Sequence, residues 1–275
     1  MCRIVAVLAM VAMVVMPAKV RADAVLEFSA KGAAKAVAEV QSMTVKDGRI
    51  LVRGSGGSRH LDYLFDRWVQ TVTVIDHRKH TVSVIDEAQV DRLNQQASAV
   101  QPLAQGLAEQ VAKLSPAERK KWQELLGESI SLDKIAQAVE PPAAITLAPA
   151  GRDKEVSGMR CKPMRIMQGA EAMAELCLAD HAAIRIPDSD YATIRALLAL
   201  YERLARRSQR VAKQFGVVIP VIAVKDMAGV PIELRDLSRE GSGSVALRRV
   251  VTAPVPPEMI ELPAGYASEP FALWQ

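Results

Sequence analysis

Two short runs of alternating apolar and polar residues lie on either side of Gly169, and each run contains one cysteine. This alternation predicts two paired β-strands with one apolar face. The apolar face is expected to hold Met164, Ile166, Ala172, Ala174, Leu176 and Leu178, and the other face Cys161, Arg165, Glu175 and Cys177. An odd-length loop centred on Gly169 would place Cys161 opposite Cys177, at a separation compatible with a disulfide. The segment therefore predicts a hairpin joined by that disulfide.

The first 22 residues have the pattern of a secretory signal peptide. Arg3 precedes an unbroken apolar run from Ile4 to Met16, and short or small residues follow at Val20 and Ala22. The run is too short to span a bilayer comfortably, since a spanning helix needs about 20 residues. We therefore expect cleavage after Ala22, export, and a mature chain without a transmembrane segment. A retained N-terminal anchor is the alternative.

Loss of this leader changes the charge and cysteine counts. The full chain has 35 basic and 31 acidic residues, and the leader contains three of the basic ones and no acidic one. The mature chain would have 32 basic residues against 31 acidic ones, so net charge gives no argument for nucleic acid binding. Cys2 leaves as well, and an even pair of cysteines in an oxidising compartment favours a structural disulfide. A redox-active pair is the weaker alternative, because no C-x-x-C motif is present.

Further hairpins are predicted before and after the cysteines. Asp47-Gly48 is a two-residue turn signal between apolar runs, and residues 54–57 are expected to form a hairpin loop. Residues 69–86 are typical of two valine-rich strands, and a three-residue turn at 77–79 would set Val74 against Val82. Later strands are expected at 217–224, 231–234 and 244–252.

Two helical regions interrupt the strands. The first runs from residue 87 to about 127, and within it Ser115, Pro116 and Glu118 have the spacing of a capping box. The second covers 188–215, and its apolar face is expected to lie on the sheet through Ile194, Leu197, Leu198, Tyr201 and Leu204. Consecutive strands with helices between them indicate one antiparallel α+β domain over 23–275, although two halves are an alternative.

The polar face of the second helix is rich in cations. Its candidates for contact with an anionic surface are Arg203, Arg206, Arg207, Arg210 and Lys213, with Arg195 nearer the start and Glu202 as the acidic residue among them. One interpretation is binding to anionic lipid head groups or to an acidic partner. The alternative is a solvated face whose cations suit the carboxyl end of the helix dipole, and a signal only one helix long favours it.

Motifs for catalysis are weak. The glycines at 54–57 lack the Gly-Lys-Ser/Thr and the following helix of a phosphate loop, and no G-x-S-x-G occurs. Asp76, His77 and His80 could be metal ligands, but no cysteine or third histidine lies nearby, so a solvated turn is favoured over a metal site. We expect no catalytic residue, no metal and no cofactor, and a hydrolase is a distant alternative.

Several segments resemble the periplasmic lipoprotein-carrier superfamily (LolA/LolB-like), and more closely a bacterial domain family of unknown function allied to it. The segments are VIDHRKHTVSVID, VSGMRCKPMRIMQGAEAMAELCLAD, GVPIEL and LPAGY. The resemblance implies a periplasmic location and a curved antiparallel sheet, an incomplete β-barrel, with helices packed on its concave face.

In characterised members of this superfamily, the space between sheet and helices holds acyl chains. The resemblance therefore implies a non-catalytic protein of cell-envelope assembly whose partner is a lipid, a lipoprotein or another apolar ligand. No carrier's functional residues match positions in this sequence, so the fold transfers better than the function. The alternative is a protein-interaction scaffold with a filled interior and an envelope protein as its partner.

Overall fold

The structure is a computed structural model that describes residues 23–31, 39–54, 60–99, 106, 109–111, 113–126, 144–214, 219–237 and 243–271. The first strands are β1 (Asp23–Lys31), β2 (Glu39–Lys46), β3 (Arg49–Arg53), β4 (Leu61–Asp66), β5 (Thr71–Asp76) and β6 (Thr81–Ile85). Helices α1 (Glu87–Ala99) and α3 (Pro116–Leu126) precede β7 (Ile145–Pro149), β8 (Lys154–Val156), β9 (Met159–Gln168) and β10 (Glu171–Ala179). The remaining elements are α5 (His181–Ile184), α6 (Asp188–Gln214), η2 (Val224–Asp226), β11 (Val230–Asp236), β12 (Ser244–Ala253), η3 (Pro257–Ile260) and β13 (Ala267–Ser268). The predicted leader lies outside the described residues.

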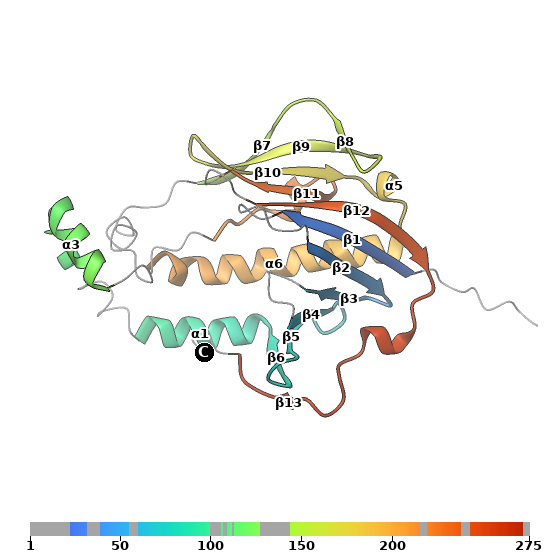
Figure 1. The fold of residues 1–275 in the computed structure, drawn as a ribbon, viewed down its shortest axis with the longest axis horizontal. Helices are drawn as coiled ribbons and strands as arrows, with labels where there is room; N and C mark the ends of the chain where they lie inside the picture. Colours follow the sequence, from blue (N-terminus) through green and yellow to red (C-terminus); the bar gives the residue numbers. More distant parts are fainter. Residues whose placement is uncertain are drawn as a thin grey trace, which may run out of the picture.

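The strands form a large, curved and unclosed sheet (Figure 1). It contains 13 strands in the order β13-β6-β5-β4-β3-β2-β1-β12-β11-β10-β9-β7, with β8 paired to β9 off this path. The neighbours are antiparallel, apart from the short parallel pair β13–β6. Strand β1 lies between β2 and β12, so the first described strand pairs in the middle of the sheet with a strand from near the C-terminal end. The predicted antiparallel α+β class is confirmed.

Of two predicted turns, one is confirmed and the other has a different length and register. The Asp47–Gly48 turn is confirmed, and both residues have positive φ, at 48° and 80°. The β5–β6 turn is longer than predicted: Ile75 pairs with Val82, so residues 77–80 form the turn and the predicted register is wrong by one residue. The carboxylate of Asp76 explains the difference, because its Oδ1 accepts hydrogen bonds from the amides of residues 78 and 79 at 2.9 and 3.0 Å.

The cysteine hairpin is confirmed, but its register is also different. The strands are joined by a two-residue turn at 169–170, and a bulge between Ala172 and Ala174 shifts the pairing. Cys177 therefore lies opposite Pro163, not opposite Cys161. Ile166, Leu176 and Leu178 are buried together on the predicted apolar face.

The helices agree with the sequence patterns at their starts. The capping box of α3 is confirmed, since the amide of Ser115 donates to Oε2 of Glu118 at 2.8 Å and the amide of Glu118 donates to Oγ of Ser115 at 3.3 Å. The strand predicted at 217–224 is wrong over its described part: residues 219–223 have no regular structure, and η2 begins at Val224.

Helix α6 lies along one face of the sheet, and α1 runs beside α6 (Figure 1). Ile194 and Leu200 of α6 are buried in the main core, together with Leu26 of β1, Val45 of β2 and Phe65 of β4. A smaller core around Leu51, Leu64, Ile75 and Ile260 packs η3 against β3–β5. The long helix is thus held by the middle of the sheet.

Candidate functional site

The sheet-facing side of α6 is only partly covered by protein. Leu200 is fully buried, whereas Tyr201 is 51% exposed, so its predicted packing on the sheet is wrong. Tyr201 is nevertheless at helical spacing from buried Ile194 and Ala205, at i−7 and i+4, which places it on the inner side of the helix. The surrounding protein raises the pKa of the Tyr201 hydroxyl by desolvation. The Tyr201 side chain is therefore partly desolvated, although half of its surface is exposed to solvent.

Other apolar side chains between α6 and the sheet are half-buried. Those that contact the main core include Phe28, Met43, Leu197, Leu198 and Leu204. Leu198 also contacts a third core, formed by Ile166, Leu176, Leu178 and Met227, and Ala174 of the cysteine hairpin packs against the same core. An apolar surface thus continues from β1–β2 along α6 to β10, and part of it remains accessible to solvent.

The cysteine pair forms the predicted disulfide beside this surface. The two sulfur atoms are 2.05 Å apart, the two Cα atoms are 5.5 Å apart, and both cysteines are buried. Cys161 lies in β9 and pairs with Lys154 of β8, whereas Cys177 lies in β10. The bridge therefore connects β10 to the part of β9 that also pairs with β8. The disulfide therefore stabilises the end of the sheet near α5.

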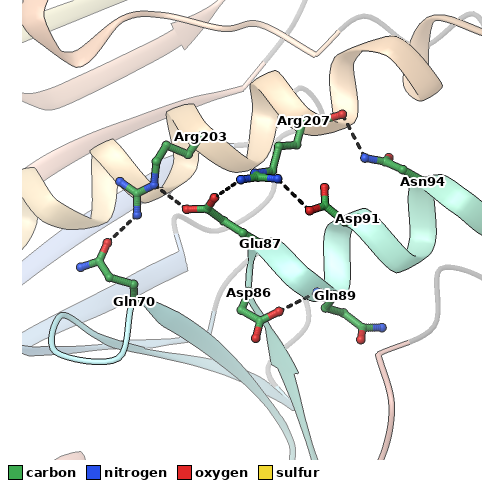
Figure 2. A network of polar contacts seen from close by, with 8 residues as sticks. All are labelled: Gln70, Asp86, Glu87, Gln89, Asp91, Asn94, Arg203 and Arg207. Atoms are coloured by element: carbon green, nitrogen blue, oxygen red, sulfur yellow. Dashed lines mark hydrogen bonds and ion pairs between the residues drawn. The ribbon is translucent and has the colours of Figure 1, made fainter.

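The arginines of α6 contact acids of α1 (Figure 2). Arg203 donates from Nε to Oε1 of Glu87 at 2.7 Å and from Nη2 to Oε1 of Gln70 at 2.5 Å. Arg207 lies 2.5 Å from Oε2 of Glu87 and 2.7 Å from Oδ2 of Asp91. These bonds lower the pKa of Glu87, and the bond from Arg203 has the largest effect. The network joins α1 to α6 by charge.

The predicted anionic-surface site is therefore partly neutralised by the fold. Arg206 pairs with Glu202 one helical turn earlier, at 2.8 Å. The side chains of Arg210 and Lys213 lie outside the described residues, although the backbone of α6 continues through both positions. Contact between these cations and an anionic surface stays a prediction. In such a contact, Arg203 and Arg207 would bind the surface either in addition to their partners on α1 or in place of them.

Arg195 is placed differently from the other α6 cations. Its guanidinium donates to the carbonyl oxygens of Met227, Gly229 and Val224, each at 2.8 Å. Glu202, two turns later, accepts from the amide of Val224 at 2.7 Å. These contacts hold the η2 segment against α6, and no local sequence signal indicates them because the partners are backbone groups.

A second polar cluster joins β4, the β5–β6 turn and the segment before β13. Nε2 of His77 is 3.0 Å from Oδ2 of Asp62, and Nδ1 of His77 is 2.9 Å from the hydroxyl of Tyr266. A histidine between a carboxylate and a hydroxyl is also an arrangement used in acid–base catalysis. His80, the other turn histidine, packs edge-on against Tyr266. Among the described residues, no group of three or more His, Cys, Asp or Glu side chains is placed to hold a metal ion.

A pocket of about 340 Å³ lies where α6 begins, next to the start of β1. Its lining includes Asp23, Asp47, Arg67, Trp68 and Asp190. Asp23 and Asp190 are both only 3% exposed, which makes them two of the most buried charged residues that the structure describes. Sequence reasoning missed this site, because the two carboxylates are far apart in the chain.

None of the described helices is both long enough and apolar enough to cross a membrane. No protein-family description and no curated sequence matches this chain. Among solved structures, an uncharacterised conserved protein from Thermus thermophilus is similar over 90% of both chains, with a TM-score of 0.39 and 7% identity. PNGF-II is similar over 92% of this chain and 31% of its own chain, with a TM-score of 0.40 and 8% identity. This chain thus spans under a third of PNGF-II, and neither likeness carries an argument about function.

Proposed function

We propose that this protein is exported to the periplasm and binds an apolar ligand, such as an acyl chain or the lipid part of a lipoprotein, between α6 and the sheet. The proposal includes the relation to the LolA/LolB-like superfamily and the placement of α1 and α6 on the concave face of an incomplete β-barrel. The protein would act in cell-envelope assembly by binding, without catalysis.

The observation that supports this proposal most directly is the position of Tyr201. It lies on the inner side of α6 between buried neighbours, yet half of its surface is exposed. The half-buried side chains of Met43, Leu197 and Leu204 extend the same apolar surface. Ligand sites are typically concave and apolar, with few polar groups that fix orientation, and the tyrosine hydroxyl would supply one such group.

A fluorescent fatty acid tests the binding site. The delipidated protein should bind the probe with a Kd of about 1 μM or lower, which corresponds to roughly −8 kcal/mol. Ala174→Trp should weaken binding at least tenfold with little loss of fold, because Ala174 is half-buried beside Leu198. Ala170→Trp is the matched control, since Ala170 is exposed in the turn of the same hairpin. Native mass spectrometry of protein purified from the periplasm should reveal the natural ligand as added mass.

Export and oxidation are tested separately. The intact mass of the protein recovered from the periplasm should correspond to a chain that begins at Asp23 and lacks two hydrogens at Cys161 and Cys177. Retention of residues 1–22, or thiol labelling of both cysteines in the unfolded and unreduced protein, would contradict export with disulfide formation.

A protein-interaction scaffold is the second candidate, and the β4–β5 turn favours it. Trp68 and Val69 in this turn are 72% and 66% exposed. Large apolar side chains at a protruding turn are typical of partner contacts. A photo-reactive residue at position 69 should then cross-link to one envelope protein in cells, and the protein should fail to bind the fatty-acid probe. Probe binding without a cross-link would exclude the scaffold.

A further inference from the structure

The pocket at the start of α6 contains one carboxylate oxygen that lacks a partner. Within the described residues, Oδ2 of Asp190 is the one buried side-chain nitrogen or oxygen without a hydrogen bond. The other oxygen, Oδ1, accepts a bond from the hydroxyl of Ser189 at 3.3 Å. Buried charged groups are almost always paired, because an unpaired one loses its hydration without compensation. The free oxygen of Asp190 therefore indicates a missing cationic or hydrogen-bonding group.

The neighbouring carboxylate, that of Asp23, does have hydrogen-bond partners. Oδ2 of Asp23 accepts from Nζ of Lys46 at 2.9 Å and from the amide of Val255 at 2.8 Å. Arg67 also lines the pocket, but its guanidinium lies 5.3 Å from the ring of Trp68, over which it stacks. The cations close to the pocket thus have other contacts, while Asp47 and Asp23 add negative charge near Asp190.

The backbone at the start of β1 lies next to Asp190. The amide of Ala24 faces the Asp190 carboxylate and lowers its pKa, in opposition to the larger effect of burial. Successive backbone nitrogens are less than about 4 Å apart. The nitrogen of Asp23 is therefore also close to the carboxylate, and in the uncleaved chain it is a neutral peptide nitrogen.

Cleavage after Ala22 would change the chemistry of that nitrogen. Hydrolysis of the Ala22–Asp23 peptide bond by an export peptidase consumes one water molecule. Ala22 leaves with a carboxylate, and the proton released remains on the new amino group of Asp23 near neutral pH, since an α-amino group has a pKa of about 7.7–8.0. The product is an ammonium group with three donors at the edge of a pocket that lacks a cation.

We propose that the α-ammonium group of Asp23 binds the free carboxylate oxygen of Asp190 in the processed protein, so that removal of the leader completes this site. The inference rests on the export and cleavage proposed above. It makes the pocket a binding site for a primary amine whose occupant is the chain's own N-terminus, and it couples processing to the stability of the contact between β1 and α6.

The two forms of the protein should respond oppositely to the same substitution. In the uncleaved chain, burial raises the pKa of Asp190 to about 6, so its charge at neutral pH destabilises the fold. There the fold is more stable when Asp190 is protonated, and that stability is lost as the pH rises from about 4 through 6. In the processed chain, the ammonium group would offset the charge, and the carboxylate would become stabilising.

The test compares two purified proteins that need no export. One is released from a fusion so that Asp23 is the first residue, and the other carries a short neutral Gly-Ser extension before Asp23. Asp190→Asn should lower the Tm of the first by about 2–4 °C at pH 7 and leave unchanged or raise the Tm of the second. Asp188→Asn, at the exposed first residue of the same helix, should shift both forms equally. A decrease of the same size in both forms after Asp190→Asn would overturn the proposal.

A titration gives an independent readout. The pKa of the Asp23 amino group, followed by nuclear magnetic resonance, should lie above the ordinary value of about 7.7–8.0 and return to it in Asp190→Asn. An ordinary pKa in the unsubstituted protein would also overturn the proposal. N-terminal sequencing of the exported protein separates the two hypotheses: a start other than Asp23 would contradict the proposed cleavage, whatever the purified protein does.

Discussion

Nδ1 of His77 lies 2.9 Å from the hydroxyl oxygen of Tyr266, although the two residues are 189 positions apart. The residues that follow Tyr266 continue the contact, since the amides of Ala267 and Glu269 donate to the carbonyls of His80 and Val82 at 3.0 and 2.9 Å. The histidine turn between β5 and β6 thus fastens the C-terminal segment to the edge of the sheet.

Tyr266→Phe should therefore loosen the C-terminal segment. The loss of one hydrogen bond is expected to lower the free energy of unfolding by about 1 kcal/mol. Hydrogen exchange at the amides of Ala267 and Glu269 should become faster, whereas exchange in β1 should not change. Tyr201→Phe is the control, because that tyrosine is on another element. Unchanged exchange at both C-terminal amides would show that the hydroxyl does not hold the segment.

Adjacent residues of α6 should respond differently to a charge. Leu200 is 0% exposed and Tyr201 is 51% exposed. Leu200→Asp should prevent folding or cost several kcal/mol, since an unpaired charge would enter the core. Tyr201→Asp should fold with a change of less than about 1 kcal/mol in urea unfolding, and on the proposed function it should weaken fatty-acid binding. Equal costs for the two substitutions would mean that the orientation of α6 is wrong.

The Glu87 network should make a small and pH-dependent contribution. Glu87 and Arg203 are 32% and 40% exposed, so Glu87→Gln should lower the free energy of unfolding by less than about 1 kcal/mol at pH 7. The hydrogen bond from Arg203 lowers the pKa of Glu87 below 4.5 in the folded state. The stabilisation is therefore present above that unfolded value and is lost as the pH falls through the folded value.

Urea unfolding of the wild type and of Glu87→Gln at pH 7 and at about pH 2 measures this contribution. The difference between the two proteins should disappear at the acidic pH and shrink in high salt. Glu258→Gln, at an exposed position, is the control and should have no effect at either pH. A difference that persists at acidic pH would assign the role of Glu87 to packing and not to charge.

Gly229 should tolerate no side chain. Its φ is +144°, and a Cβ atom would lie 2.4 Å from the carbonyl oxygen of Ala179 in β10. Gly229→Ala should cost about 2–4 kcal/mol, because backbone strain adds to a collision with an immobile backbone atom. Gly151→Ala is the matched control: its φ is +127°, but a Cβ atom there would meet nothing within 4 Å. Thermal unfolding of both variants should show a clearly larger loss at Gly229.

Features that depend on neighbours in the sequence were predictable. The Asp47–Gly48 turn, the capping box of Ser115 and Glu118, and the apolar face of the cysteine hairpin are confirmed, because each is determined by residues a few positions apart. The disulfide was also predictable from two cysteines on facing strands. Its exact register was not, since a bulge between Ala172 and Ala174 shifts Cys177 to a position opposite Pro163.

Only the tertiary structure decided which distant groups meet. The pattern of α6 places Arg203 on the polar side of the helix, away from the core. The pattern does not indicate its partner Glu87, which is 116 positions away in the sequence. Arg195 has the same charge and the same kind of sequence context, yet it binds backbone carbonyls of residues 224–229. Asp190 remains without a partner at one oxygen for the same reason. Alternation and helical spacing specify which face of an element is apolar, whereas the partner of each polar group depends on how β1, β12, α1 and α6 come together.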